Sequence, residues 1–166
     1  IDDWVFSLTG DGFDTDGCYS GNGQVNETIL AALLNDEFFS APPPKSLDRN
    51  HFSAQHLASL SIEDGAATLA RFTIEAIAVS IQHAVEAPVL WVVCGGGRHN
   101  PTIMRGLRER LNADVVEAEA IGFDGDAIEA EAWAYLGVCS MHGEAITFPG
   151  TTGVSSPMTG GVVARA

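Results

Sequence analysis

One segment constrains the fold of this chain more than any other: an apolar run that ends in three glycines and leads into a helix start. Residues 89–94 are apolar without alternation, which predicts a strand buried on both faces, as in a parallel sheet flanked by helices. The glycines at 95–97 let the backbone turn sharply. Asn100 and Pro101 fit an N-cap and a first helical position, because proline lacks the N–H that would go unpaired there.

This succession of strand, glycine turn and helix has two interpretations. Open α/β sheets hold nucleotides at the carboxyl ends of strands and near helix N-termini, which favours a nucleotide site. A glycine turn of this kind also occurs as a plain connection, and that alternative stays open. The segment matches neither G-x-G-x-x-G nor the Lys-Ser/Thr ending of a P-loop, so a dinucleotide or Walker-type site is disfavoured.

Composition excludes several classes of partner. The chain has 166 residues, the length of one domain, and a formal net charge of −14. Such an acidic chain lacks the clustered cations that nucleic acid requires and is disfavoured at an anionic membrane surface. It has no apolar run of about 20 residues. Cys18, Cys94 and Cys139 show no C-x-x-C spacing, which favours a reducing, cytoplasmic compartment.

Local signals predict several helices and only two strands. Helices are expected over 1–9, 27–34, 61–83 and 101–111, and a second strand over 114–116. Two strands would leave much backbone unpaired, so we expect the sheet to be incomplete in this chain. The chain also starts at Ile1 rather than methionine. We therefore expect a C-terminal piece of a longer protein.

Another helix is predicted to follow the second strand, after a loop over 121–125. Asp126 fits its N-cap and Glu129 the third position, which together form a capping-box pattern. A glutamate at a helix start beside a ligand loop also binds substrate hydroxyls, so both roles of Glu129 stay open. The Gly- and Thr-rich tail from Gly143 indicates loops that cover a surface.

Charged side chains gather at three other places. Residues 11–17 alternate aspartates with other residues, but the register of a calcium loop fails, so an acidic surface loop is expected. Lys45 and Arg49 fit either an anionic ligand or a solvated loop. Arg98 and three arginines of the following helix favour a nearby anion, although a solvated face explains the other three equally well.

Four motifs, in this order and spacing, resemble those of the anhydro-N-acetylmuramic acid kinases. They are Pro-Pro-Pro-Lys-Ser at 42–46, Cys-Gly-Gly-Gly-Arg-His-Asn-Pro at 94–101, Gly-Asp-Ala-Ile-Glu-Ala-Glu-Ala-Trp-Ala at 125–134, and Pro-Gly-Thr-Thr-Gly at 149–153. The resemblance runs from the first helix almost to Ala166.

The resemblance implies an α/β fold in which two ribonuclease-H-like lobes, of the actin and hexokinase type, close over ATP. Residues 1–166 would be the C-terminal lobe, and the N-terminal lobe would lie outside this chain. The implied reaction is an ATP-dependent transfer of phosphate to the 6-oxygen of 1,6-anhydro-N-acetylmuramic acid, while water opens the anhydro ring. The product would be N-acetylmuramic acid 6-phosphate, in the recycling of bacterial cell wall.

The resemblance also implies site residues. Gly95, Gly96, Gly97 and Asn100 would line the nucleotide, and Glu129 would contact the muramyl sugar, which raises its ligand role above capping. The role of Lys45 and Ser46 in the family motif stays unassigned. Many family members continue that motif with Thr-Gly-Arg, where this chain has Leu-Asp-Arg at 47–49, so the local turn is expected to differ.

The family's phosphate loop and catalytic aspartate lie upstream of this chain. We therefore expect no catalytic residue and no metal ligand within it, and no turnover by the chain alone, although ATP and Mg²⁺ would serve the whole enzyme. The main rival function is a non-catalytic nucleotide-binding module, and a structural or interaction domain is a third. Homodimerisation also stays open.

Overall fold

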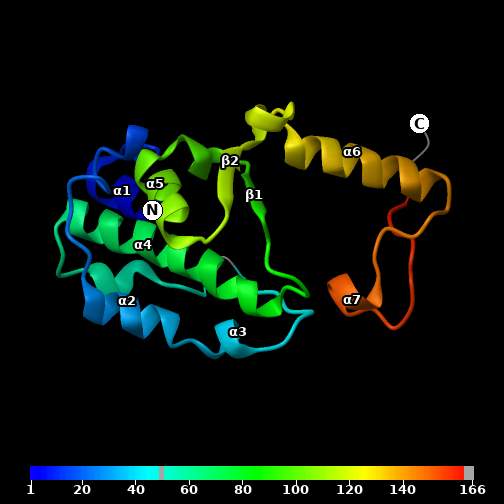
Figure 1. Ribbon diagram of the computed structural model, residues 1–166, viewed down its shortest axis with the longest axis horizontal. Coiled ribbons are helices and arrows are strands. Elements are labelled where there is room, and N and C mark those ends of the chain that lie inside the picture. The colour runs from blue at the N-terminus through cyan, green and yellow to red at the C-terminus, as the bar shows by residue number, and fades with distance from the viewer. Residues whose placement is uncertain (49–50, 163–166) are drawn as a thin grey trace.

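The computed structural model describes residues 1–48 and 51–162 and combines helices with a small parallel sheet (Figure 1). Most elements form a body, residues 1–48 and 51–125, and the remaining residues, 126–162, form an arm that extends away from it. The helices and strands are α1 Asp2–Thr9, α2 Glu27–Leu34, α3 Glu37–Ser40, α4 Ile62–Val79, β1 Leu90–Val93, α5 Pro101–Arg110, β2 Asp114–Glu117, α6 Ile128–Met141 and α7 Pro149–Thr152.

Helix α4 is the centre of the body. It begins where the sequence predicts, because the Ser61 hydroxyl accepts a hydrogen bond of 3.1 Å from the Asp64 backbone N–H. One side of α4 is buried against α5 and β2, around Ile74 and Leu107. Small residues let α1 approach it closely: a Cβ on Gly65 would lie 2.4 Å from Trp4 Nε1. These contacts make α4 a common support for α1, α5 and the sheet.

The sheet has two parallel strands, with Leu90 opposite Asp114 and Val93 opposite Glu117. One face packs on the core beneath α4 and α5. On the other face Leu90 and Val92 are 45% and 39% exposed. The prediction of a strand buried on both faces is therefore wrong for this chain, since nothing among the described residues covers the second face. The predicted shortage of strands is confirmed: the described residues form a two-stranded sheet and one isolated bridge.

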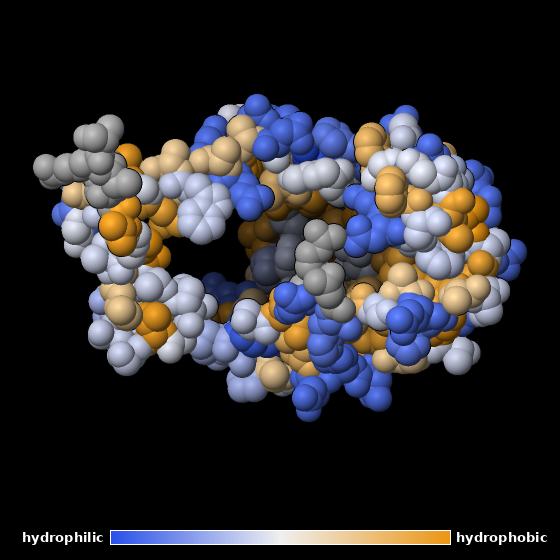
Figure 2. Space-filling view, turned by 180° about the vertical axis from the view of Figure 1, so that it is seen from behind, coloured by the Kyte–Doolittle hydropathy of each residue, from blue (hydrophilic) through white to orange (hydrophobic). Residues whose placement is uncertain are grey.

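The arm has little packing of its own. Cys139 is the single buried residue of α6 within the described chain, although the helix is apolar along most of its length. Trp133, Tyr135 and Met141 are between 66% and 74% exposed. Figure 2 shows an opening between the arm and the body. The loops of the tail lie against part of α6, where the Ser140 hydroxyl donates to the Gly160 carbonyl, and the tail returns to the body where Gly153 lies against Pro44.

The exposed apolar helix of the arm is too short to cross a bilayer. Within residues 1–48 and 51–162, no helix combines the length and apolar character that crossing a membrane requires.

Candidate functional site

The glycine turn follows β1 at its carboxyl end, as predicted. Gly95 has a φ of 72°, a left-handed conformation that favours glycine, and its N–H donates to the Gly125 carbonyl at 2.9 Å. Gly96 and Gly97 have no such requirement, and a Cβ built on either would meet no atom within 4 Å. The first glycine is therefore explained by the backbone, whereas the next two face open space.

Asn100 caps α5, as predicted, and does more. Its Oδ1 accepts hydrogen bonds from the N–H groups of Thr102 and Ile103, at 3.0 and 3.3 Å. Its Nδ2 donates to Asp14 Oδ2 at 3.1 Å and Ser20 Oγ at 3.3 Å. The amide is 7% exposed and both of its polar atoms have partners. A direct contact with a nucleotide stays a prediction, while the geometry makes Asn100 the tie between the turn and residues 11–20.

Residues 11–17, expected to be a surface loop, include a buried acid. Asp14 is 6% exposed, and its carboxylate accepts from the backbone N–H groups of Tyr19 and Ser20 at 2.8 and 3.2 Å. These two N–H groups lie five and six residues later in the chain, and the Asn100 amide donates to the same carboxylate, so no short-range turn pattern predicts this burial. The loop is therefore fixed in place beside the glycine turn.

A pocket of about 540 Å³ separates this loop from the glycine turn. Phe13 and Asp16 line it on one side, and Gly96 and Gly97 on the other. The sequence analysis missed both loop residues as candidates for the site. The remaining lining residues are Ile1, Asp2, Gly12, Asp14, Thr15, Thr73, His99, Asn100 and Ile103. The pocket is large enough for a small organic ligand such as a nucleoside.

Arg98, at the end of the glycine turn, is buried with its side chain 3% exposed. The expected anion beside it consists of two carboxylates of the chain itself: Glu119 Oε1 at 2.7 Å and Asp126 Oδ1 at 2.7 Å. Hydrogen bonds from Arg98 are the main cause that lowers the pKa of Glu119 to about 2 and that of Asp126 to about 2. The same bonds raise the pKa of Arg98.

The predicted capping box at the start of α6 is wrong. The helix begins at Ile128, and the Asp126 carboxylate binds Arg98 instead of capping. No side chain of the described residues caps this helix, and Asp124 Oδ1 accepts from the N–H groups of Asp126 and Ala127, at 2.9 and 3.3 Å, in the turn before it. Glu129 is exposed, and its carboxylate makes no hydrogen bond or ion pair with the rest of the described chain. Capping therefore does not account for Glu129, and its contact with a sugar stays a prediction.

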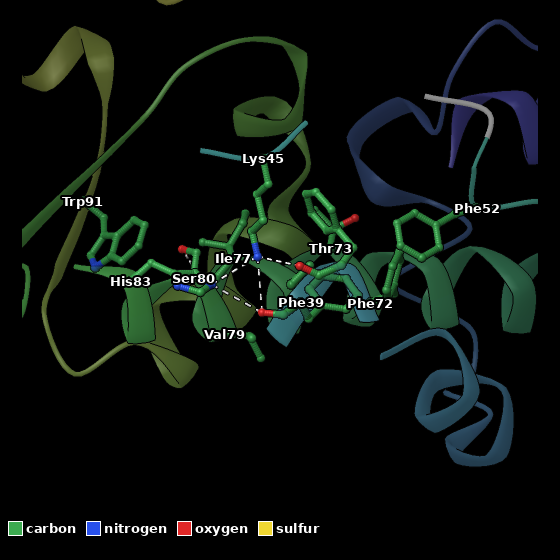
Figure 3. Close-up of a pocket in the computed structure, with 12 residues that line it drawn as sticks. Phe39, Lys45, Phe52, Phe72, Thr73, Ile77, Val79, Ser80, His83 and Trp91 are labelled. Atoms are coloured by element: carbon green, nitrogen blue, oxygen red, sulfur yellow. Dashed lines mark hydrogen bonds between the residues drawn. The ribbon is translucent and has the colours of Figure 1, made fainter. Parts of the chain in front are cut away.

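A second pocket, of about 460 Å³, lies between α3 and α4 and is lined mostly by aromatic and aliphatic side chains (Figure 3). Lys45 reaches into it and donates to the Phe38 and Phe39 carbonyls and to His83 Nε2, the last at 3.1 Å. The ammonium also lies 4.6 Å from the centre of the Phe38 ring. Lys45 therefore joins the proline segment to α3 and to the 3₁₀ helix Ser80–His83 that follows α4, which is a structural role. Arg49 lies outside the described residues.

Neither pocket is accompanied by a cluster of metal-ligating side chains among the described residues. Residues 1–48 and 51–162 contain no group of three or more His, Cys, Asp or Glu side chains placed to hold a metal ion.

Comparison with known proteins gives one consistent result. The family model described as anhydro-N-acetylmuramic acid kinase matches residues 1–166. Similar curated proteins carry the same name, and three examples illustrate the match. The protein of Rhizorhabdus wittichii is 47% identical over 165 residues, that of Caulobacter vibrioides 54% over 149, and that of Methylobacterium nodulans 48% over 165.

These matches cover nearly all of this chain but less than half of each relative. They span 99%, 90% and 99% of the chain, and 45%, 40% and 44% of the relatives, in the same order. The chain thus spans about 45% of the length of the curated relatives that it matches.

Proposed function

This chain belongs to the anhydro-N-acetylmuramic acid kinase family, and we propose that it forms the C-terminal lobe of an ATP-dependent sugar kinase. The proposed reaction converts 1,6-anhydro-N-acetylmuramic acid, ATP and water into N-acetylmuramic acid 6-phosphate and ADP. Water opens the anhydro bridge while the γ-phosphate passes to the sugar 6-oxygen. Such an enzyme would work in the bacterial cytoplasm, in cell-wall recycling.

The observation that carries the proposal is the open space in front of the glycine turn. A nucleotide needs a place where backbone N–H groups and a helix N-terminus are accessible to it. Gly96 and Gly97 border a pocket of about 540 Å³, and no protein atom lies where a side chain on either would begin. This open pocket favours a ligand site over a turn that only connects the strand to the helix.

We assign the nucleoside of ATP to this pocket. Asp16 and Asp2 line it, and their charge would repel the phosphates, whereas carboxylates accept hydrogen bonds from ribose hydroxyls. Phe13, 60% exposed, offers an aromatic ring to the base. The phosphates would then extend out of the pocket, past the glycine turn.

The sugar is assigned to Glu129 at the start of α6. Its carboxylate is exposed and unpaired within the described chain, and it belongs to the segment that follows the loop bonded to the glycine turn. A free carboxylate is a strong acceptor for sugar hydroxyls. This chain would therefore form one wall of the sugar site.

Catalytic residues would come from outside this chain. The described residues contain no group of three or more side chains placed to hold a metal ion, and we propose that Mg²⁺ takes its ligands from the ATP phosphates and from other parts of the enzyme. The general base for the attacking water is expected upstream. Residues 1–166 alone should accordingly bind nucleotide without turnover.

Two exposed apolar surfaces support the proposal that this lobe is incomplete. The open face of the sheet displays Leu90 and Val92, and α6 displays Trp133 and Tyr135. Contiguous apolar surface of this kind is rare on a finished monomer and marks a contact site. The partner that we propose is the remainder of the enzyme, including its N-terminal lobe.

A coupled ADP-release assay with Mg-ATP and 1,6-anhydro-N-acetylmuramic acid tests this function, on residues 1–166 and on the full-length gene product. Release by the full-length protein only, and only with the anhydro sugar, is the expected result. If neither protein releases ADP while residues 1–166 still bind ATP, the chain is a nucleotide-binding module instead. Absence of both activities would leave a structural domain.

A further inference from the structure

We propose that Arg98 is a positioning residue that holds the glycine turn and the start of α6 in one arrangement, so that nucleotide and sugar meet in register. This inference rests on the proposed function, because it assigns the nucleotide to the turn and the sugar to Glu129. It adds a residue that touches neither ligand.

The contacts of Arg98 join its own turn to two later segments, 21 and 28 positions along the chain. Its Nη1 donates to the Gly95 carbonyl at 3.0 Å and to Asp126 Oδ1 at 2.7 Å. Its Nε and Nη2 donate to Glu119 Oε1, at 3.0 and 2.7 Å. One guanidinium thus binds the turn after β1, the 3₁₀ helix after β2 and the residue that precedes α6 by two positions.

The backbone closes around the same guanidinium. Gly95 N–H donates to the Gly125 carbonyl at 2.9 Å, and Gly125 N–H donates to Glu119 Oε1 at 3.1 Å. A Cβ on Gly125 would lie 2.5 Å from Arg98 Nε, so the loop lies directly on the side chain. The planar guanidinium has five donors in a fixed fork, and this geometry specifies the relative placement of its partners.

Packing offers no substitute for this cluster. Helix α6 buries a single residue, Cys139, at the end far from Glu129. The start of the helix is therefore fixed by polar contacts: those of Arg98 and those of Asp124 within the turn before the helix. Loss of the guanidinium would also leave Glu119 and Asp126 without their cation, and the two carboxylates would repel each other. The start of α6 would then move relative to the glycine turn.

The test uses the full-length protein with Arg98→Met and Arg98→Lys. Arg98→Met should lower kcat/KM for ATP and for the anhydro sugar together, each by about 100-fold, because a displacement of about 1 Å in a reacting pair costs this much. Arg98→Lys keeps the positive charge but lacks the planar fork of donors, so its two kcat/KM values should lie between those of Arg98→Met and wild type. The control is Arg110→Met, which removes an exposed arginine paired with Glu75 at 2.7 Å and should stay within about twofold of wild type.

A second variant reaches the same contact from the other side. Gly125→Ala pushes on the guanidinium and should reduce both kcat/KM values, whereas Arg110→Met again serves as the control and should not. A purely structural Arg98 would lower the unfolding midpoint and leave both kcat/KM values of the folded protein unchanged. That result overturns the proposal.

Failure of the proposed function is distinguishable, because it appears in the wild-type protein as absence of ADP release. The positioning claim is then decided by amide exchange, measured residue by residue. Exchange at Gly95 and Gly125 should be at least tenfold faster in Arg98→Met than in Arg110→Met. Equal exchange in the two variants would overturn it.

Discussion

The body and the arm of this molecule are built on different principles. In the body, α4 and α5 bury a continuous apolar core in which Leu107 is 1% exposed. In the arm, α6 carries as many large apolar side chains as a core helix but leaves Trp133 and Tyr135 in solvent. An apolar helix without a partner indicates a surface that is completed elsewhere. The nucleotide half of the proposed site is preformed in the body, whereas the sugar half lies at the start of a helix that we propose the rest of the enzyme covers.

The largest expected difference between the two regions is in core substitutions. Leu107→Ala should lower the free energy of unfolding by about 2–5 kcal/mol, because it leaves a cavity in a closed core. Val138→Ala in α6, where the side chain is 54% exposed, should change it by less than about 0.5 kcal/mol in residues 1–166. Urea denaturation of both variants measures this. Equal losses would mean that the arm is packed as tightly as the body.

A smaller effect is expected where the loop before α2 meets α4. Gly23→Ala should cost about 1–3 kcal/mol, since the new Cβ would lie 2.0 Å from the Glu63 carbonyl oxygen and the backbone must shift. Gly12→Ala is the matched control, with an ordinary φ and no atom within 4 Å of the new Cβ. Thermal unfolding of both variants measures this difference in stability. A Gly23→Ala protein as stable as wild type would show that the loop and α4 are loosely packed at this junction.

The glycine turn allows binding to be separated from stability. Gly96→Val should leave the unfolding midpoint nearly unchanged, because its side chain enters open space. It should weaken nucleotide affinity by about tenfold, which is about 1.4 kcal/mol, because that space is the proposed nucleotide site. Calorimetric titration with ADP measures the affinity. Wild-type affinity in a folded variant would remove the nucleotide from this turn.

The smallest expected effect is the pH dependence that Arg98 confers. Since Arg98 lowers the pKa of Glu119 and Asp126 to about 2, below their ordinary values, the two carboxylates stabilise the fold above those ordinary values. This contribution should be lost as the pH falls from about 5 toward 2. Their exposure, 46% and 68%, keeps it small through solvent screening.

Denaturation of wild type and Arg98→Met over pH 2–7 measures that contribution. The two stability curves should differ most near neutral pH and converge in acid. Curves that stay parallel would show that the ion pairs contribute no pH dependence.

The sequence was informative where structure is decided locally. The caps of α4 and α5 followed from Ser61 and from Asn100-Pro101, because each side chain satisfies backbone groups two or three residues away. The parallel pairing of the two strands is likewise consistent with their connection through a helix.

The predictions that failed concern side chains whose contacts lie far away in the sequence. The Asp126 carboxylate binds an arginine 28 positions earlier instead of capping its own helix, and no local pattern distinguishes these two uses. The burial of Asp14 depends on Asn100 in the same way, 86 positions later. The exposed face of β1 could not be predicted from composition, because whether an apolar strand is covered depends on the rest of the fold.

Hydrogen–deuterium exchange, measured on residues 1–166 alone and within the full-length gene product, tests the contrast between body and arm most directly. The amides of α4 and α5 should be equally protected in both proteins, because their packing is complete in this chain. Those of α6 should exchange at least about tenfold faster in the isolated chain, where Trp133, Tyr135 and Met141 of this helix are exposed. Equal protection of α6 in the two proteins would contradict the account, since the arm would then need no partner.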